Sequence, residues 1–340
     1  MRKFTTVVLL VLLLCSLVGC HQETAYITTA PTTKTIDQIS MAEKIGTTGN
    51  HINGTTSGNI SMGLGTFSYS DGYIYFSDYN AIYEYSLESG ITVKLSVEGD
   101  GWPPFFLYVL GDKIMFSGEK GIETISRDGK EQSVLYEGVS GWSTYIDGND
   151  CYYLTAQGGV LCHRDFLTGV TNEYFGFVNT FFVTEDSIYA CADEKAYDGS
   201  NTPETAVYVA SREDMVFTKV ETSENPIAVC VNGDDLFYAK WGKTWYIYHI
   251  SDGVEEKLPI QSFYFQSIGE QIIYIDKNSL ALKSYNWKTE EERLLSETVL
   301  HFCILEDRYV CLRTGDVESD FIMIDLYTDS VKDMLPEQEE

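Results

Sequence analysis

The chain has 340 residues, of which 44% are hydrophobic and 14% aromatic, so it is long and apolar enough to bury a sizeable core. This composition excludes a wholly disordered protein, despite 51 acidic against 23 basic residues and a formal charge of −28. The negative charge repels phosphate backbones and anionic lipid surfaces. We therefore expect no nucleic-acid partner and no membrane binding through charge.

The first residues predict a secretory signal peptide over residues 1–19. Arg2 and Lys3 give a positive start, and the apolar run from Phe4 to Val18 follows directly. This run is shorter than the ~20 residues that a helix needs to span a membrane. An uncleaved anchor and an ordinary signal peptide are the alternatives at this point.

The sequence LVGC at residues 17–20 resembles the recognition box of bacterial lipoprotein signals. The resemblance implies cleavage after Gly19 and acylation of Cys20, which places the protein on the cell membrane, lipid-anchored and facing outside the cytoplasm. Stable anchoring needs two or more acyl chains, which a diacylglyceryl group supplies. Removal of Arg2 and Lys3 leaves 21 basic and 51 acidic residues, a formal charge of −30.

The mature chain divides by composition into three parts. Residues 20–55 are Thr-rich, lack a sustained apolar period and predict a tether. We predict that residues 56–336 form the folded domain and that residues 337–340 form a short acidic tail. No cofactor-binding motif is present, and we expect a monomer.

The folded part repeats a unit of 36 to 48 residues seven times. Each unit holds an apolar run, a tight turn, a second apolar or aromatic run, a third run ending in a polar turn, and a more polar fourth run. The tight turns begin at Asp71, Gly111, Gly148, Glu185, Gly233, Gly269 and Glu306. Four strands of five or six residues fill such a period.

These units predict an all-β fold, a β-propeller of seven four-stranded blades. Six or eight blades are the alternatives, because an atypical terminal unit is easily miscounted. The apolar first run suits the buried strand at the axis, and the charged fourth run suits the exposed edge. Ring closure by a shared strand is not evident, although a strand near Asn59–Met62 is a candidate partner for the last blade.

The Tyr-rich units, opened by Thr56-Ser57-Gly58-Asn59, resemble a family of Gram-positive bacterial propeller lipoproteins. More broadly, they are similar to TolB-like and low-density-lipoprotein-receptor-like propeller repeats. The resemblance covers about residues 50–335 and implies the architecture. It carries no catalytic residues, because propellers host many activities.

Strand order places aromatic residues on one face of the predicted ring. We define the top face by the loops that join second to third strands and fourth strands to the next blade, and the bottom face by the turns between first and second strands. The top face receives the ligand-binding candidates Trp102, Trp142, Phe177, Trp241 and Trp245. Such rings suit a glycan or a peptide side chain, although packing between blades is the alternative.

The bottom turns all carry acidic residues, which turn chemistry or attraction of cations would explain. The histidines show no metal-ligand spacing, and His301 at the start of an inner strand is either a channel residue or a structural one. Six cysteines remain after residues 15 and 20 are set aside. They are small core residues, or they pair as Cys151–Cys162 and Cys303–Cys311 in an oxidising compartment.

These features together predict a non-catalytic binding module that recognises a protein, peptide or glycan at the cell envelope. The alternative is an extracellular polysaccharide hydrolase or lyase with its site at the channel mouth. No linear catalytic motif is present, and we name no catalytic residue. Residues from different blades can converge at the axis, so the alternative stays open.

Overall fold

The computed structural model describes residues 52–54, 56–62, 65–78, 81–96, 104–118, 120–137, 141–155, 159–193, 204–222, 225–240, 244–262, 264–314 and 320–335. The predicted signal peptide, Cys20, the tether as far as residue 51 and the acidic tail lie outside these residues. In the part of the chain that is described, no helix has the length and hydropathy required to cross a membrane.

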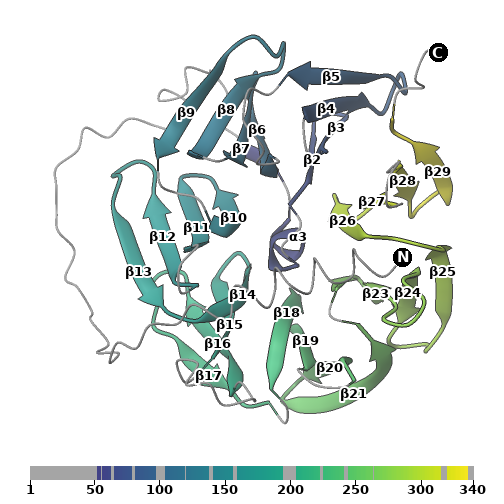
Figure 1. Cartoon of the computed structure of the whole chain (residues 1–340). Coiled ribbons are helices and arrows are strands. Elements are labelled where there is room, and N and C mark those ends of the chain that lie inside the picture. The colour runs from purple at the N-terminus through teal and green to yellow at the C-terminus, as the bar shows by residue number, and fades with distance from the viewer. Residues whose placement is uncertain are drawn as a thin grey trace, which may run out of the picture.

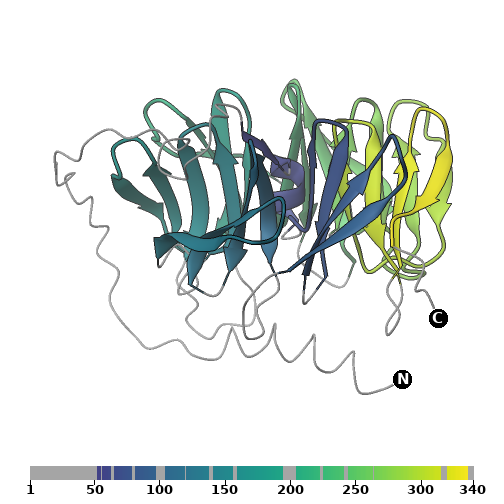
Figure 2. The same ribbon diagram turned by 90° about the horizontal axis from the view of Figure 1, so that it is seen from above.

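Seven antiparallel sheets stand around a central axis, which confirms the predicted seven-bladed β-propeller (Figure 1 and Figure 2). In each blade the chain forms the strands in order from the axis outward. The first four blades are β2–β5 (Phe67–Ser70, Tyr73–Ser77, Ala81–Ser86, Thr92–Ser96), β6–β9 (Phe105–Leu110, Lys113–Gly118, Gly121–Ser126, Gln132–Glu137), β10–β13 (Gly141–Asp147, Asp150–Thr155, Leu161–Asp165, Thr171–Phe175) and β14–β17 (Val178–Val183, Ser187–Asp193, Thr205–Ser211, Thr218–Val220). Blades 5 to 7 are β18–β21 (Pro226–Asn232, Asp235–Lys240, Tyr246–Ser251, Val254–Gln261), β22–β25 (Phe265–Ile268, Gln271–Ile275, Leu282–Asn286, Glu292–Ser296) and β26–β29 (His301–Leu305, Tyr309–Arg313, Phe321–Asp325, Ser330–Asp333).

Burial along the strands follows the predicted order from axis to rim. Inner strand β6 buries every residue from Phe106 to Leu110, whereas the described residues of outer strand β29 are exposed or half-buried. The charged outer strands leave each sheet with an edge that does not invite pairing with another chain.

Glycines at the bottom turns explain why these hairpins are tight. In four blades a glycine with positive φ follows the first strand: Gly111, Gly148, Gly233 and Gly269. A residue without a Cβ adopts this conformation at no steric cost. A two-residue turn that begins with such a residue matches the twist of the flanking strands.

In blades 3 and 6 the residue after the third strand packs against the blade before it. Phe166 stacks on Tyr136 of blade 2 with ring centroids 4.7 Å apart. Trp287 similarly contacts His249 of blade 5 at 4.8 Å. In six blades the backbone N–H of this residue donates to a carbonyl of its own bottom turn, in the pairs Leu87–Gly72, Arg127–Asp112, Phe166–Asn149, Arg212–Asp186, Trp287–Glu270 and Leu326–Arg308.

The ring closes between blades 7 and 1 without an exchanged strand, because each of these blades is built from one continuous segment. Aromatic packing joins them: the ring of Phe321 lies 4.8 Å from that of Phe76 and 6.0 Å from that of Phe67. Thr92 also donates a hydrogen bond to the carbonyl of Met334. Closure therefore depends on side chains and not on a shared sheet.

Two elements before the first blade lie at the axis (Figure 1). Strand β1 (Ile52–Gly54) pairs with β6 as a fifth strand of blade 2. The short helix α3 (Ser57–Ser61) follows, and all five of its residues are buried. The prediction of a strand near Asn59–Met62 that pairs with the last blade is wrong, because these residues form a helix whose side chains make the contacts instead.

All six cysteines of the propeller lie buried inside strands. Cys303 and Cys311 lie directly opposite each other on β26 and β27. Cys151 lies opposite Arg164, and Cys162 lies opposite Tyr153, so that pair is offset by two residues.

Candidate functional site

Helix α3 lies at the axis of the ring (Figure 1). Its first turn is capped by Thr56, whose hydroxyl accepts a hydrogen bond from the backbone N–H of Asn59. Such a cap satisfies a backbone donor that has no partner within the helix. The helix is only five residues long, so its polar side chains must hold it in place.

Asn59 binds the inner edge of blade 7 like a strand residue. Its amide donates to the carbonyl of Ile304 at 2.9 Å and accepts from the N–H of Ile304 at 2.8 Å. Gln266 of blade 6 donates to the same Asn59 oxygen at 2.7 Å. One fully buried side chain therefore satisfies backbone groups that face the channel with no strand beside them.

The remaining polar side chains of α3 bind blades 4 and 5. The hydroxyl of Ser57 accepts from the N–H of Val183 at 2.5 Å. Ser61 donates to the carbonyl of Val229 at 2.5 Å, and Thr180 donates to the carbonyl of Ser61 at 2.6 Å. With Asn59, these bonds connect the helix to four consecutive blades, 4 to 7.

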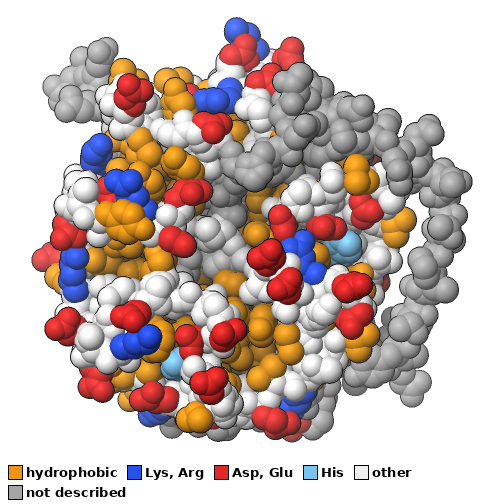
Figure 3. Space-filling model, turned by 180° about the vertical axis from the view of Figure 1, so that it is seen from behind, with side chains coloured by type: hydrophobic (Ala, Val, Ile, Leu, Met, Phe, Trp, Pro, Cys, Tyr) orange, Lys and Arg blue, Asp and Glu red, His pale blue; other side chains and the backbone are white. Residues whose placement is uncertain are grey.

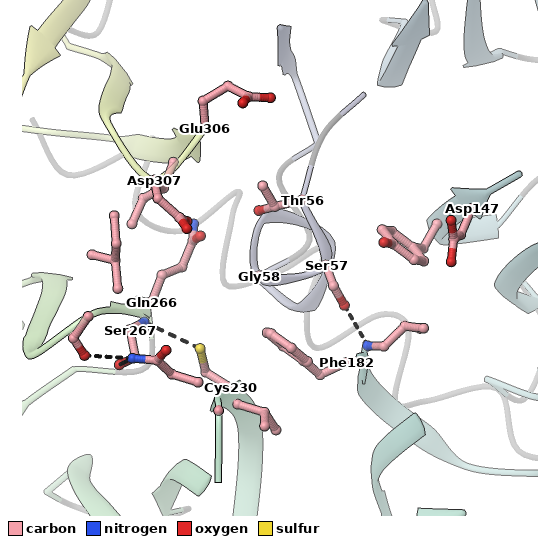
Figure 4. Close-up of a pocket in the computed structure, with 18 of the residues that line it drawn as sticks. Thr56, Ser57, Gly58, Asp147, Phe182, Cys230, Gln266, Ser267, Glu306 and Asp307 are labelled. Atoms are coloured by element: carbon pink, nitrogen blue, oxygen red, sulfur yellow. Dashed lines mark hydrogen bonds between the residues drawn. The ribbon is translucent and has the colours of Figure 1, made fainter. Parts of the chain in front are cut away.

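A pocket of about 470 Å³ surrounds the first turn of α3 on the bottom face (Figure 4). Six blades contribute to it, each through the end of its inner strand. The polar and charged side chains of the lining are Thr56, Ser57, Tyr108, Tyr145, Asp147, Asn232, Gln266, Ser267, Glu306 and Asp307. The lining includes Thr56, Ser57 and Gly58, so the pocket adjoins the start of the helix that lies at the axis.

Three carboxylates lie in the lining, and they differ in their partners. Asp147 of blade 3 accepts from Arg212 at 2.7 Å, so its charge is compensated. Figure 4 places Glu306 and Asp307 on the other side of α3 from Asp147. The next residue along the chain, Arg308, binds Asp325 and not these two carboxylates.

Glu306 and Asp307 occupy an unusual backbone conformation. Their φ angles are +53° and +47°, in the left-handed region, where four other blades begin the turn with glycine. L-residues with a side chain lose roughly 1–2 kcal/mol in this region, less for Asp. Blade 7 therefore keeps two acidic side chains at the pocket at a cost in backbone strain.

Carboxylates are spread over the bottom face, both at its rim and around its middle (Figure 3). Some of the predicted bottom-turn acids have partners within their blades. His163 bonds Asp150 at 2.6 Å and lowers the pKa of that carboxyl, and His249 bonds Asp235 at 2.8 Å. Within the described ranges, no three His, Cys, Asp or Glu side chains are grouped so that they could hold a metal ion.

The five aromatic candidates of the top face stay predictions. Trp102 and Trp241 lie outside the described residues, and the side chain of Trp142 is likewise not described. Phe177 is exposed, and Trp245 is half-buried with the ammonium of Lys277 4.9 Å from its ring. The pocket lies on the opposite face from Phe177 and Trp245.

His301 is the first residue of inner strand β26 and is half-buried. Its Nε2 lies 3.2 Å from the hydroxyl of Thr66, and Arg313 is its partner on the next strand. Burial of the imidazole, followed by the charge of Arg313, lowers the pKa of His301 to about 4. The ring is therefore neutral at pH 7.

We expect this histidine to make stability depend on pH between about 6.5 and 4. In that range the unfolded chain binds a proton that the folded chain does not, so the free energy of unfolding falls as pH falls, by up to about 3 kcal/mol. Urea unfolding of wild type and His301→Gln at several pH values tests this. A wild-type slope that persists unchanged in the variant would contradict the assignment.

Sequence reasoning missed the pocket residues on inner strands and the role of α3. Ser57, Asn59 and Ser61 alternate with Gly58 and Ile60 in a stretch that joins a polar tether, so they carry no apolar period. The sequence offered one clue to the helix. Thr56, three positions before Asn59, is a residue type that is typical of a helix start.

No protein-family model matches the chain, and no curated protein sequence matches it. Solved structures resemble it at low identity. The tricorn protease has a TM-score of 0.59 and 10% identity, over 85% of this chain and 35% of that chain. The β-propeller domain of the Trilobed protease from Pyrococcus furiosus, described as having an open velcro topology, has a TM-score of 0.58 and 11% identity, over 82% and 97%.

The oligogalacturonate lyase from Vibrio parahaemolyticus has a TM-score of 0.53 and 12% identity, over 86% of this chain and 91% of that chain. This chain spans only about a third of the length of the tricorn protease chain. Proteases and a lyase thus share the architecture at identities that carry no activity across. The fold that these similarities establish is that of a β-propeller.

Proposed function

We propose that the protein is an extracytoplasmic lipoprotein, anchored through Cys20, whose propeller is a non-catalytic binding module for a protein or peptide of the cell envelope. The pocket on the bottom face is the proposed site. It suits a cationic group, such as a lysine or arginine side chain, because acidic residues surround it and Glu306 and Asp307 line it.

The observation that carries this proposal is the pocket around the first turn of α3, whose lining includes three carboxylates. Concave sites with a few placed polar groups are the usual places for ligands. Its hydroxyl and amide side chains, among them Asn232 and Ser267, would orient a bound group. Two acidic residues held at positive φ at such a place favour a functional role.

The polysaccharide hydrolase or lyase is a weaker proposal. Such chemistry uses two carboxylates that flank one bond. Glu306 and Asp307 come from a single turn, and Asp147 across the helix is bound by Arg212 at 2.7 Å. If Asp147 were paired with Glu306 or Asp307 for catalysis, Asp147 would still be held as the counter-ion of Arg212. We therefore favour binding without catalysis.

Neutralising the pocket should weaken binding of basic peptides. We expect short Lys- or Arg-containing peptides to bind the wild type in calorimetric titration and to lose about 10-fold or more in affinity with Glu306→Gln/Asp307→Asn. The reason is that a hydrogen bond to a charged group contributes about 1.5–3 kcal/mol.

Glu88→Gln is the matched control, because Glu88 is an exposed acid in the bottom-face turn after β4, far out in blade 1. It should leave affinity unchanged. Equal binding of basic and acidic peptides by the wild type, or equal losses in both variants, would contradict the proposed site.

The anchor is tested separately with Cys20→Ser. We expect the wild type to incorporate labelled fatty acid in cells and the variant to incorporate none, because a serine hydroxyl cannot form the thioether. Cys15→Ser, which changes a residue within the signal peptide, should be labelled like the wild type. Equal labelling of the Cys20→Ser protein would contradict lipid anchoring at this residue.

A further inference from the structure

Two cysteines of blade 7 face each other across neighbouring strands. Cys303 on β26 and Cys311 on β27 are direct partners in the antiparallel register, and neither has any exposed surface. Both pack in the same cluster as Phe67, Phe76 and Phe321. Directly opposite residues of an antiparallel pair have Cα atoms about 4.5–5.5 Å apart, and disulfides bridge about 4.4–6.8 Å.

A second pair with similar sequence spacing lacks this geometry. Cys151 is the partner of Arg164, and Cys162 is the partner of Tyr153, so these two cysteines are diagonal neighbours. Diagonal positions are about 7–8 Å apart, beyond the reach of a disulfide without backbone movement. The two cysteine pairs have similar spacing in the sequence, but only Cys303 and Cys311 are directly opposite each other in the strand register.

We propose that Cys303 and Cys311 form a disulfide across β26 and β27 when the chain folds in the presence of a disulfide donor, and that the other four cysteines stay thiols. The donor is a small-molecule or oxidoreductase disulfide. In the cell this rests on the proposed export, because an oxidising compartment supplies such donors.

The reaction is two thiol–disulfide exchanges. The thiolate of one cysteine attacks the donor disulfide and displaces one donor thiolate, and the thiolate of the other cysteine then attacks the mixed disulfide and displaces the second. The two protons of the chain's thiols end on the two donor thiols, and the donor gains two electrons.

The exchange must precede closure of the ring. Burial raises the pKa of Cys303 to about 12, and the thiol of Cys311 is held well above its ordinary pKa for the same reason. Because the thiolate is the attacking species, the folded protein exchanges slowly. Hairpin β26–β27 is local in sequence, so its cysteines meet before blades 7 and 1 pack together.

The position of the pair gives the bond a structural consequence. Cys303 and Cys311 lie in the cluster that joins blade 7 to blade 1, where no strand is exchanged. The contact between blades 7 and 1 requires that the hairpin β26–β27 stay folded. A covalent link between these two strands limits local opening of the hairpin. The oxidised protein should consequently melt a few degrees above the reduced protein.

Refolding of the full chain with oxidised and reduced glutathione tests the proposal, since it needs neither export nor a ligand. The refolded protein is denatured in excess alkylating reagent, digested with trypsin and analysed by mass spectrometry. Cleavage after Arg308 places Cys303 on peptide 294–308 and Cys311 on peptide 309–313, so the disulfide links two separate peptides. Cys151 and Cys162 share peptide 131–164, which serves as the internal control.

We expect the linked peptides 294–308 and 309–313 in most molecules, and two alkyl groups on peptide 131–164. Melting temperature should fall on reduction in the wild type and in Cys151→Ala, and stay constant in Cys311→Ala. Alkylated Cys311 in nearly all molecules, or a linkage within peptide 131–164 at equal yield, would overturn the proposal while leaving the binding function untouched.

Discussion

Asn59→Ala is expected to destabilise the propeller by about 3–5 kcal/mol. The change removes three buried hydrogen bonds and leaves both backbone groups of Ile304 and the amide of Gln266 without their partner. Each buried group left unsatisfied costs about 1–3 kcal/mol. Whole domains are stable by only 5–15 kcal/mol, so the loss is a large part of the total.

Urea unfolding followed by tyrosine and tryptophan fluorescence measures this effect as a lower midpoint. Asn59→Asp should be nearly as severe, because a carboxylate cannot donate to the Ile304 carbonyl. Asn278→Ala, in an exposed turn of blade 6, should change stability by less than about 0.5 kcal/mol. Asn59 and Asn278 variants of equal stability would show that α3 does not hold the ring.

Phe321→Ala should cost about 3–5 kcal/mol, the range for truncation of a buried phenylalanine. Phe321 is almost completely buried between blades 7 and 1, in contact with Phe76 and Phe67. Because no strand crosses this seam, the lost aromatic contacts are not replaced by sheet hydrogen bonds.

Phe321→Leu keeps most of the volume and should cost less than about 1.5 kcal/mol. Val331→Ala, on the exposed outer strand of the same blade, should have little effect on the melting temperature. Limited proteolysis adds a spatial readout: Phe321→Ala should be cleaved first in blades 7 and 1. Cleavage that begins in blades 3 or 4 would contradict the seam as the weak point.

Repetition made the fold predictable from the sequence. Seven turns followed by apolar runs, with a charged fourth run in each unit, were enough to predict blade number and strand order. Each blade is a local structure, because the alternation of side chains between the two faces of its strands is complete within one repeat unit. The strand order also predicted which loops share a face, and the structure has the chain in that order.

The candidate site was not predictable in the same way, because it depends on contacts between distant residues. Asn59 and Ile304 are 245 positions apart, and no local sequence pattern near either residue indicates that they form hydrogen bonds with each other. The α3 segment has weak helix propensity, with Gly58 and Asn59 in its middle. Its helix forms because the inner strands offer unpaired backbone groups, which is a property of the closed ring.

The pocket acids were visible in the sequence but were explained by turn chemistry. That explanation suits Asp71, which precedes Gly72 at a hairpin turn. It suits Glu306 poorly, since glutamate has no preference for positive φ. Blade 4 carries the same pair at its turn, Glu185-Asp186, without positive φ, so the turn sequence alone did not single out blade 7.

The path of the chain along the axis determines how the domain responds to mechanical load. Strand β1 and α3 run through the centre of the ring, so a pull on residues before Ile52 acts on the hub and not on a rim. Such a pull must shear the bonds of α3 to blades 4 to 7 together, whereas a pull on an outer strand would unzip one blade at a time. A load applied to the chain before Ile52 would thus be shared by four blades.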